Sequence, residues 1–96
     1  MKTIFEFERV LLNLIDALVS TGTADELFAS GYLRGHISLA VAHCEIDGRN
    51  HIQDVKHRVL AGLQEACISG ELSDKDQKLV LLMWQRLLQQ AESQLA

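Results

Sequence analysis

The stretch SDKDQKLVLLMWQRLLQQAESQL, residues 73–95, decides the fold class. Ser73 is a typical N-cap, and Asp74 and Asp76 follow it at the positive end of a helix dipole. Apolar residues then recur at intervals of three and four, which places them on one face of an α-helix. This face holds Leu79, Val80, Met83, Trp84, Leu87, Leu88, Ala91 and Leu95. The pattern predicts a long amphipathic helix that begins after Ser73.

Two further helices are predicted in the N-terminal half. The first runs from about Thr3 to Ser20, and Gly22 follows it, where a left-handed residue often ends a helix. Thr23 and Glu26 form a capping-box pattern, which predicts the start of the second helix. The inner face of the first helix consists of Ile4, Phe7, Leu11, Leu14, Ile15 and Leu18.

The second helix contains two glycines, Gly31 and Gly35. Two structures are compatible with them. Either a short helix ends at Gly31 and another begins, or one kinked helix runs from about Ala24 to Ile46. Each glycine lowers the stability of a helix by about 1 kcal/mol relative to alanine. We therefore expect the pair to have a structural purpose, either a close helix crossing or a break in the helix.

The segment 47–50 reads as a turn, and a third helix is predicted after it. Asn50 and Gln53 are its expected cap pair, and it ends near Ser69. Short connections place consecutive helices antiparallel. The prediction is therefore an all-α protein, an antiparallel up-down bundle of four main helices, with residues 1–96 forming one domain.

Composition narrows the function classes. The 96 residues are 48% hydrophobic, include no proline and carry a formal net charge of −4. The nine basic residues are scattered, which disfavours nucleic-acid binding, because such proteins usually carry a basic stripe. The longest apolar run, 79–84, is far shorter than the ~20 residues of a membrane span. We therefore expect no membrane contact. Cys44 and Cys67 are interpreted as reduced thiols, which is typical of a cytoplasmic protein.

Two segments resemble the YfcL family of small bacterial proteins. The first is DELFASGYLRGH at residues 25–36, and the second combines GELS at 70–73 with DQ at 76–77, LV at 79–80 and MW at 83–84. The resemblance extends over the whole chain, and the unbroken first segment is its more specific part. It implies a bacterial cytosolic protein, and it brings no catalytic residue or cofactor with it.

One rim of the second helix groups residues that could bind a ligand. Tyr32, His36 and His43 lie within about 60° of one another on a helical wheel, and Arg34 is near them in sequence. Such a rim could hold an anionic group or a partner's acidic side chain, or it could simply extend polar tips into water. His36 and His43 are about 10.5 Å apart along the axis, too far for one zinc, so no metal or cofactor is predicted.

Apolar residues exceed what four single-faced helices require. The surplus includes Phe5, Leu12, Val19 and Leu81, which we interpret as a candidate interaction surface. No motif for nucleophilic catalysis is present, so an enzyme is the less favoured reading. The leading hypothesis is a non-enzymatic protein–protein interaction module that binds another protein or a second copy of itself. The alternative is a small anionic-ligand-binding protein or enzyme that uses the Tyr32, Arg34 and His36 rim.

Overall fold

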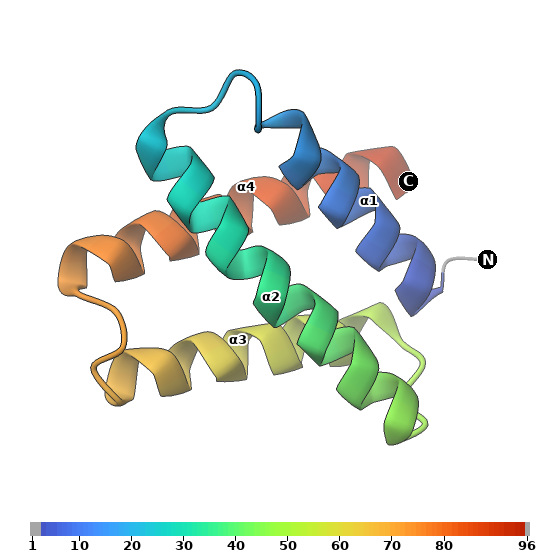
Figure 1. Ribbon diagram of the computed structural model, residues 1–96. Helices are drawn as coiled ribbons and strands as arrows, with labels where there is room; N and C mark the ends of the chain where they lie inside the picture. Colours follow the sequence, from blue (N-terminus) through green and yellow to red (C-terminus); the bar gives the residue numbers. More distant parts are fainter. Residues whose placement is uncertain (1–2, 96) are drawn as a thin grey trace.

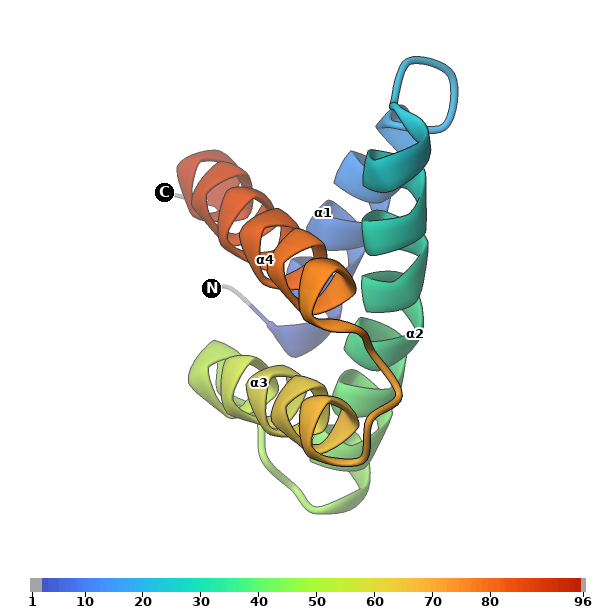
Figure 2. The ribbon, with the colours of Figure 1, turned by 90° about the vertical axis from the view of Figure 1, so that its left-hand side faces the viewer.

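The computed structural model describes residues 3–95, and four α-helices make up most of them (Figure 1). Residues 3–95 contain no β-strand. The first and second helices run in opposite directions, as do the third and fourth, and the last two cross the second helix obliquely (Figures 1 and 2). The predicted all-α, up-down order of four helices is confirmed. The helices are α1 (Ile4–Ala17), α2 (Ala24–Ile46), α3 (Ile52–Ile68) and α4 (Asp74–Leu95).

Local sequence fixes the starts of α2 and α4. The Thr23 hydroxyl accepts a hydrogen bond from the Glu26 amide at 3.1 Å, and the Glu26 carboxylate accepts one from the Thr23 amide at 2.9 Å. The Ser73 hydroxyl accepts from the Asp76 amide at 3.2 Å. These bonds satisfy amides that the first turn of a helix leaves without partners. Both predicted caps are confirmed.

The end of α1 differs from the prediction. The helix ends at Ala17 rather than Ser20, and Gly22 is not in the left-handed conformation that was expected. Glycine suits this position for a different reason: a Cβ added to Gly22 would lie 2.7 Å from the Leu18 carbonyl oxygen. Close packing in the turn between α1 and α2, and not a positive φ, is therefore the reason that glycine suits this position.

The start of α3 is also displaced from the prediction. His51 is the N-cap, and its amide donates to the Asp54 carboxylate at 3.3 Å. The predicted pair, Asn50 with Gln53, lies one residue earlier. The three-residue spacing of the two pairs is the same, and an acidic partner at the positive end of the helix dipole is favoured over a neutral one.

α2 is a single unbroken helix over Ala24–Ile46, which are the bounds of the second predicted alternative, so Gly31 does not divide it. A Cβ added at Gly31 or at Gly35 would meet nothing within 4 Å. Both residues are exposed. The prediction that the two glycines permit a break or a close crossing is therefore wrong within this chain.

α2 and α3 end in the same way. Gly48 and Gly70 have φ of 71° and 79°, the left-handed conformation that glycine adopts without steric cost. After Gly70, the amide of Glu71 donates back to the Ala66 carbonyl at 3.0 Å, which is a Schellman closure. The equivalent bond after Gly48 is made by the amide of Arg49. These turns reverse the chain and direct Glu71 toward α2.

α2 is the central helix. It packs against α1, α3 and α4, whereas α3 and α4 barely contact each other although they are consecutive. Figure 2 shows α3 and α4 on the same side of α2, with α4 along its N-terminal half and α3 along its C-terminal half. The Cα atoms span 36 × 31 × 17 Å. In this flat arrangement no other helix of residues 3–95 covers the outer side of α2 (Figure 1).

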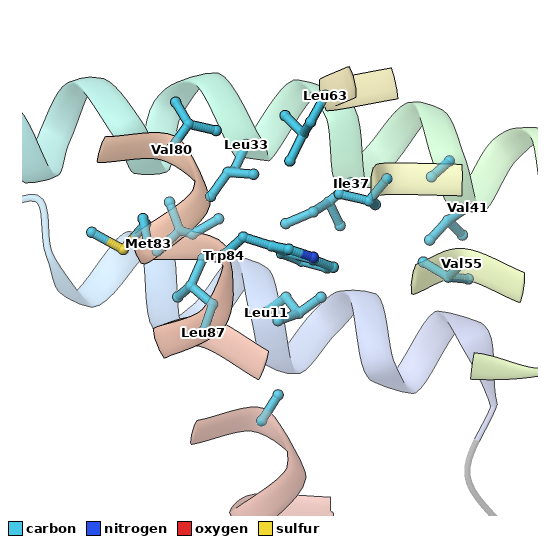
Figure 3. Close-up of a cluster of buried hydrophobic side chains, with 14 of the residues drawn as sticks. Leu11, Leu33, Ile37, Val41, Val55, Leu63, Val80, Met83, Trp84 and Leu87 are labelled. Atoms are coloured by element: carbon cyan, nitrogen blue, oxygen red, sulfur yellow. The ribbon is translucent and has the colours of Figure 1, made fainter. Parts of the chain in front are cut away.

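The core lies between α2 and the other helices. Trp84 of α4 lies between Leu11 of α1 and Ile37 of α2 (Figure 3), and all three are almost fully buried. Burying each such side chain contributes about 1.5–3 kcal/mol. The ion pairs between helices are largely exposed, and such pairs contribute less than about 1 kcal/mol each. Apolar packing therefore holds the helices in place.

Candidate functional site

An open groove of about 490 Å³ lies between α2 and α3, and we call it the α2–α3 groove. One wall comes from α2 and the other from α3, and the turn after α3 supplies two more residues. Its lining combines small side chains, which leave room, with titratable ones. The lining residues are His36, Leu39, Ala40, His43, Arg58, Ala61, Gly62, Glu65, Ala66, Ser69 and Glu71.

Aromatic rings stack along the α2 side of this groove. The Phe28 and Tyr32 ring centroids are 6.2 Å apart, and those of Tyr32 and His36 are 4.9 Å apart with the planes tilted by 37°. The four-residue spacing brings the rings together because side chains at i and i+4 are neighbours on a helix. The His36 ring rests on Gly62 of α3: a Cβ added there would lie 3.0 Å from His36 Nδ1.

The Tyr32 hydroxyl is buried and has no hydrogen-bond partner. Burial raises the pKa of the Tyr32 phenol above its ordinary value, and the negative charge of Glu71 raises it further. Both effects disfavour the phenolate. Tyr32 is therefore a neutral donor at the end of the groove where the Schellman turn brings Glu71.

Basic and acidic residues of the groove lie toward opposite ends. His43, in the last turn of α2, and Arg58, in the first half of α3, line the groove near the turn that joins the two helices. Glu65 and Glu71 lie toward the other end. Arg58 is also paired with Asp47 at the end of α2. The groove thus has one basic and one acidic end.

The structure separates Arg34 from the rest of the predicted rim. The Arg34 guanidinium bonds the Asp16 carboxylate of α1 at 2.6 Å, whereas His36 contacts α3. Residues two apart on a helix point about 160° from each other, so adjacency in sequence was misleading. Tyr32 and His36 do stack, and His36 and His43 line the same groove. The placement of Arg34 on the rim is corrected.

Four groove residues on or after α3 were not singled out from the sequence: Arg58, Gly62, Glu65 and Glu71. Their contribution depends on how α3 packs against α2, which helical periodicity does not specify. One signal was available, since a glycine such as Gly62 in mid-helix costs stability and often marks a close approach.

The predicted interaction surface is not continuous. Phe5 and Val19 are 49% and 68% exposed, but Phe5 lies near the start of α1 and Val19 lies two residues beyond its end. Leu12, between them, is half-buried and packs against the core. Leu81 is 37% exposed on a different helix, α4.

Both cysteines, Cys44 and Cys67, are free thiols. Cys44 is buried, and burial raises the pKa of its thiol, which disfavours the nucleophilic thiolate. Within residues 3–95, no group of three or more His, Cys, Asp or Glu side chains is placed to hold a metal ion. No helix in this part of the chain combines the length and apolarity that crossing a membrane requires.

The structure is thus that of a small helical protein with an open groove on its surface. Comparison with known proteins identifies its family: the profile of the YfcL protein family matches residues 5–89. The chain belongs to the YfcL family, as the resemblance in the sequence predicted. It is 50% identical over 91 residues to "Uncharacterized protein YfcL" of Escherichia coli (strain K12), which covers 95% of this chain and 99% of the relative. No solved structure matches the chain significantly.

Proposed function

We propose that this protein is a non-enzymatic protein-interaction module that receives a segment of another protein in the α2–α3 groove. The observation that carries the proposal is the charge separation along the groove, with His43 and Arg58 at one end and Glu65 and Glu71 at the other. A bound segment with an acidic residue toward one end and a basic residue toward the other would meet complementary charge at both.

The dimensions of the groove support a short peptide segment. Arg58 and Ser69, the C-cap of α3, are eleven residues apart, which corresponds to about 16 Å along the helix axis. About five extended residues or three turns of helix span that distance. Ala61 and Gly62 add little bulk to the α3 wall, and Leu39 offers apolar surface opposite them, which suits one apolar side chain of the segment.

Binding of a small anion is supported less well. Arg34, the cation expected to hold such a ligand, is bonded to Asp16. Glu65 and Glu71 outnumber Arg58 among the charged residues that line the groove, so its walls disfavour a free anion. We expect inorganic phosphate to leave the NMR resonances of His36 unshifted at constant pH. A saturable shift of these resonances by phosphate would favour the anion-binding function instead.

The test is a charge reversal with a matched control. We expect a tagged wild-type chain to co-purify a stoichiometric partner from its native cells, and Glu65→Lys to lose that partner. Glu45→Lys makes the same charge change on an exposed part of α2 outside the groove, and should retain the partner.

A photo-crosslinking residue at Ala61 identifies what occupies the groove in living cells. We expect it to capture the partner that Glu65→Lys loses. If Glu65→Lys and Glu45→Lys retain the partner equally, and the Ala61 probe captures no protein, the proposed function is wrong.

A further inference from the structure

The outer side of α2 carries an uncharged stripe that runs the length of the helix. Its residues follow one another at intervals of four, three, four, four, three and four, which keeps them on one helical face. Every one is exposed, and Ile46 and Leu39 are 80% and 55% exposed. We call this set the α2 stripe, and it consists of Ala24, Phe28, Gly31, Gly35, Leu39, Ala42 and Ile46.

The two glycines of the α2 stripe have no explanation within one chain. Glycine in a helix interior makes the helix less stable than alanine would. Alanine would nevertheless fit at both positions, because a Cβ at Gly31 or Gly35 would meet no atom within 4 Å. α2 is unbroken and has no helix on its outer side (Figures 1 and 2). What a missing Cβ does permit is the close approach of a second backbone from outside the chain.

The order of large and small residues indicates which backbone fits there. Counted outward from Gly35, stripe residues occur at four, seven and eleven positions in both directions, so the stripe is symmetric about this glycine. Each large residue on one side corresponds to a small one on the other. The matched pairs are Gly31 with Leu39, Phe28 with Ala42, and Ala24 with Ile46.

We propose that two copies of this chain associate through the α2 stripe, with the two helices antiparallel and a two-fold axis at Gly35. A two-fold interface brings the same patch of each copy together, so each residue must fit its mate in the symmetric set. In the antiparallel arrangement, Leu39 of one copy enters the space above Gly31 of the other, and Phe28 lies on Ala42.

A parallel pairing does not fit the same stripe. It would place Phe28 against Phe28 and Gly31 against Gly31, which produces crowding at one level and a void at the next.

Charge is also compatible with the antiparallel pair. The chain carries a net charge of −4, so two copies repel unless their contact avoids acidic residues, and the α2 stripe contains none. On one flank of α2, Asp25 lies ten positions before Gly35, beside α4, and His43 lies eight positions after it, beside α3. The antiparallel pair therefore brings each Asp25 close to His43 of the other copy, a favourable contact.

Sedimentation or light scattering tests whether the chain pairs. We expect the mass to rise with concentration toward twice the 10.7 kDa of one chain. Gly35→Arg places a charge on the two-fold axis, and because its Cβ meets nothing in the chain it should fold normally and remain monomeric. Gln64→Arg adds the same charge to an exposed position of α3 and should still pair.

A double substitution separates association from folding. Gly31→Ala with Gly35→Ala should raise the unfolding temperature of the dilute monomer, since alanine favours the helix. It should weaken pairing by about tenfold, equivalent to about 1.4 kcal/mol, because the backbones can no longer approach as closely. A misfolded variant could not show both effects.

Cysteine pairs establish the register. In a Cys67→Ser background, which leaves only the buried Cys44, Gly31→Cys mixed with Leu39→Cys should form an oxidised heterodimer. Neither variant should cross-link efficiently alone.

Three results overturn the proposal. One is a wild-type chain that stays monomeric up to about 1 mM, which would leave no specific affinity to explain. Another is a dimer that persists in Gly35→Arg, and the third is efficient cross-linking of Gly31→Cys to itself. The α2 stripe shares Leu39 with the α2–α3 groove, and its flanking contact uses His43. The groove tests use variants of α3 and Glu45, outside the α2 stripe, so the two sets of results remain distinguishable.

Discussion

Gly62→Ala probes the contact that builds the middle of the α2–α3 groove. Alanine in place of glycine stabilises a helix interior by about 1 kcal/mol. Against this gain, the new Cβ would lie 3.0 Å from His36 Nδ1, so the ring must move. An off-rotamer side chain costs about 0.5–1.5 kcal/mol, and a lost aromatic pair, here that of His36 with Tyr32, costs a similar amount. The expected net change is a destabilisation of about 0–2 kcal/mol.

Gly31→Ala is the matched control, because its Cβ meets nothing. It should stabilise the dilute monomer by about 1 kcal/mol, so the two variants should differ by about 1–3 kcal/mol, the cost of displacing His36. Urea unfolding followed by the fluorescence of Trp84, the single tryptophan, measures both free energies of unfolding. NMR shifts of the His36 ring report its displacement. If Gly62→Ala stabilises the protein as much as Gly31→Ala and leaves the His36 resonances in place, the contact does not exist.

Three further perturbations test the core, a turn and the buried phenol. Phe7→Ala should lower the free energy of unfolding by about 3–5 kcal/mol because Phe7 is fully buried, whereas Phe5→Ala should change it by less than about 1 kcal/mol; similar losses in urea unfolding would contradict the burial pattern. Gly70→Ala should cost about 1–2 kcal/mol in the same assay, because its φ of 79° is unfavourable for alanine, and an unchanged midpoint would argue against the turn. In an absorbance titration of Tyr32, the single tyrosine, Glu71→Gln should lower the raised pKa toward the ordinary phenol value. Since the folded-state pKa is the higher one, the contribution of Tyr32 to stability is complete below the ordinary phenol pKa and is lost as the pH rises through the folded value. A phenol that titrates identically in both proteins would mean that Glu71 is not its neighbour.

Helix starts were the most predictable part of the fold. The bonds that cap α2 and α4 join residues three positions apart, so short segments such as Thr23 to Glu26 contain all the required chemistry. Where two neighbouring pairs could cap a helix, as before α3, a shift of one residue was enough to make the prediction wrong. The end of α1 was harder still, because the close approach of Gly22 to Leu18 is visible only once the turn is folded.

The candidate site was predictable only on its α2 side. Tyr32 and His36 are one turn apart on the same helix, so their stacking follows from periodicity alone. Arg34 could not be placed in this way, because its position depends on Asp16 of α1. Arg58 and Glu65 come from α3, and nothing in the spacing of one helix specifies which flank of another helix it contacts.

The sequence by itself determined the helices, their order and the residues on each inner face, because caps and apolar spacing act over only a few positions. It also contains the symmetric alternation of large and small residues along the outer side of α2. Only the tertiary structure decided that this side is uncovered, that Gly31 and Gly35 face open space, and that acidic and basic residues of two helices share one groove. These features depend on how helices pack across long sequence separations, where the burial of many side chains together sets the geometry.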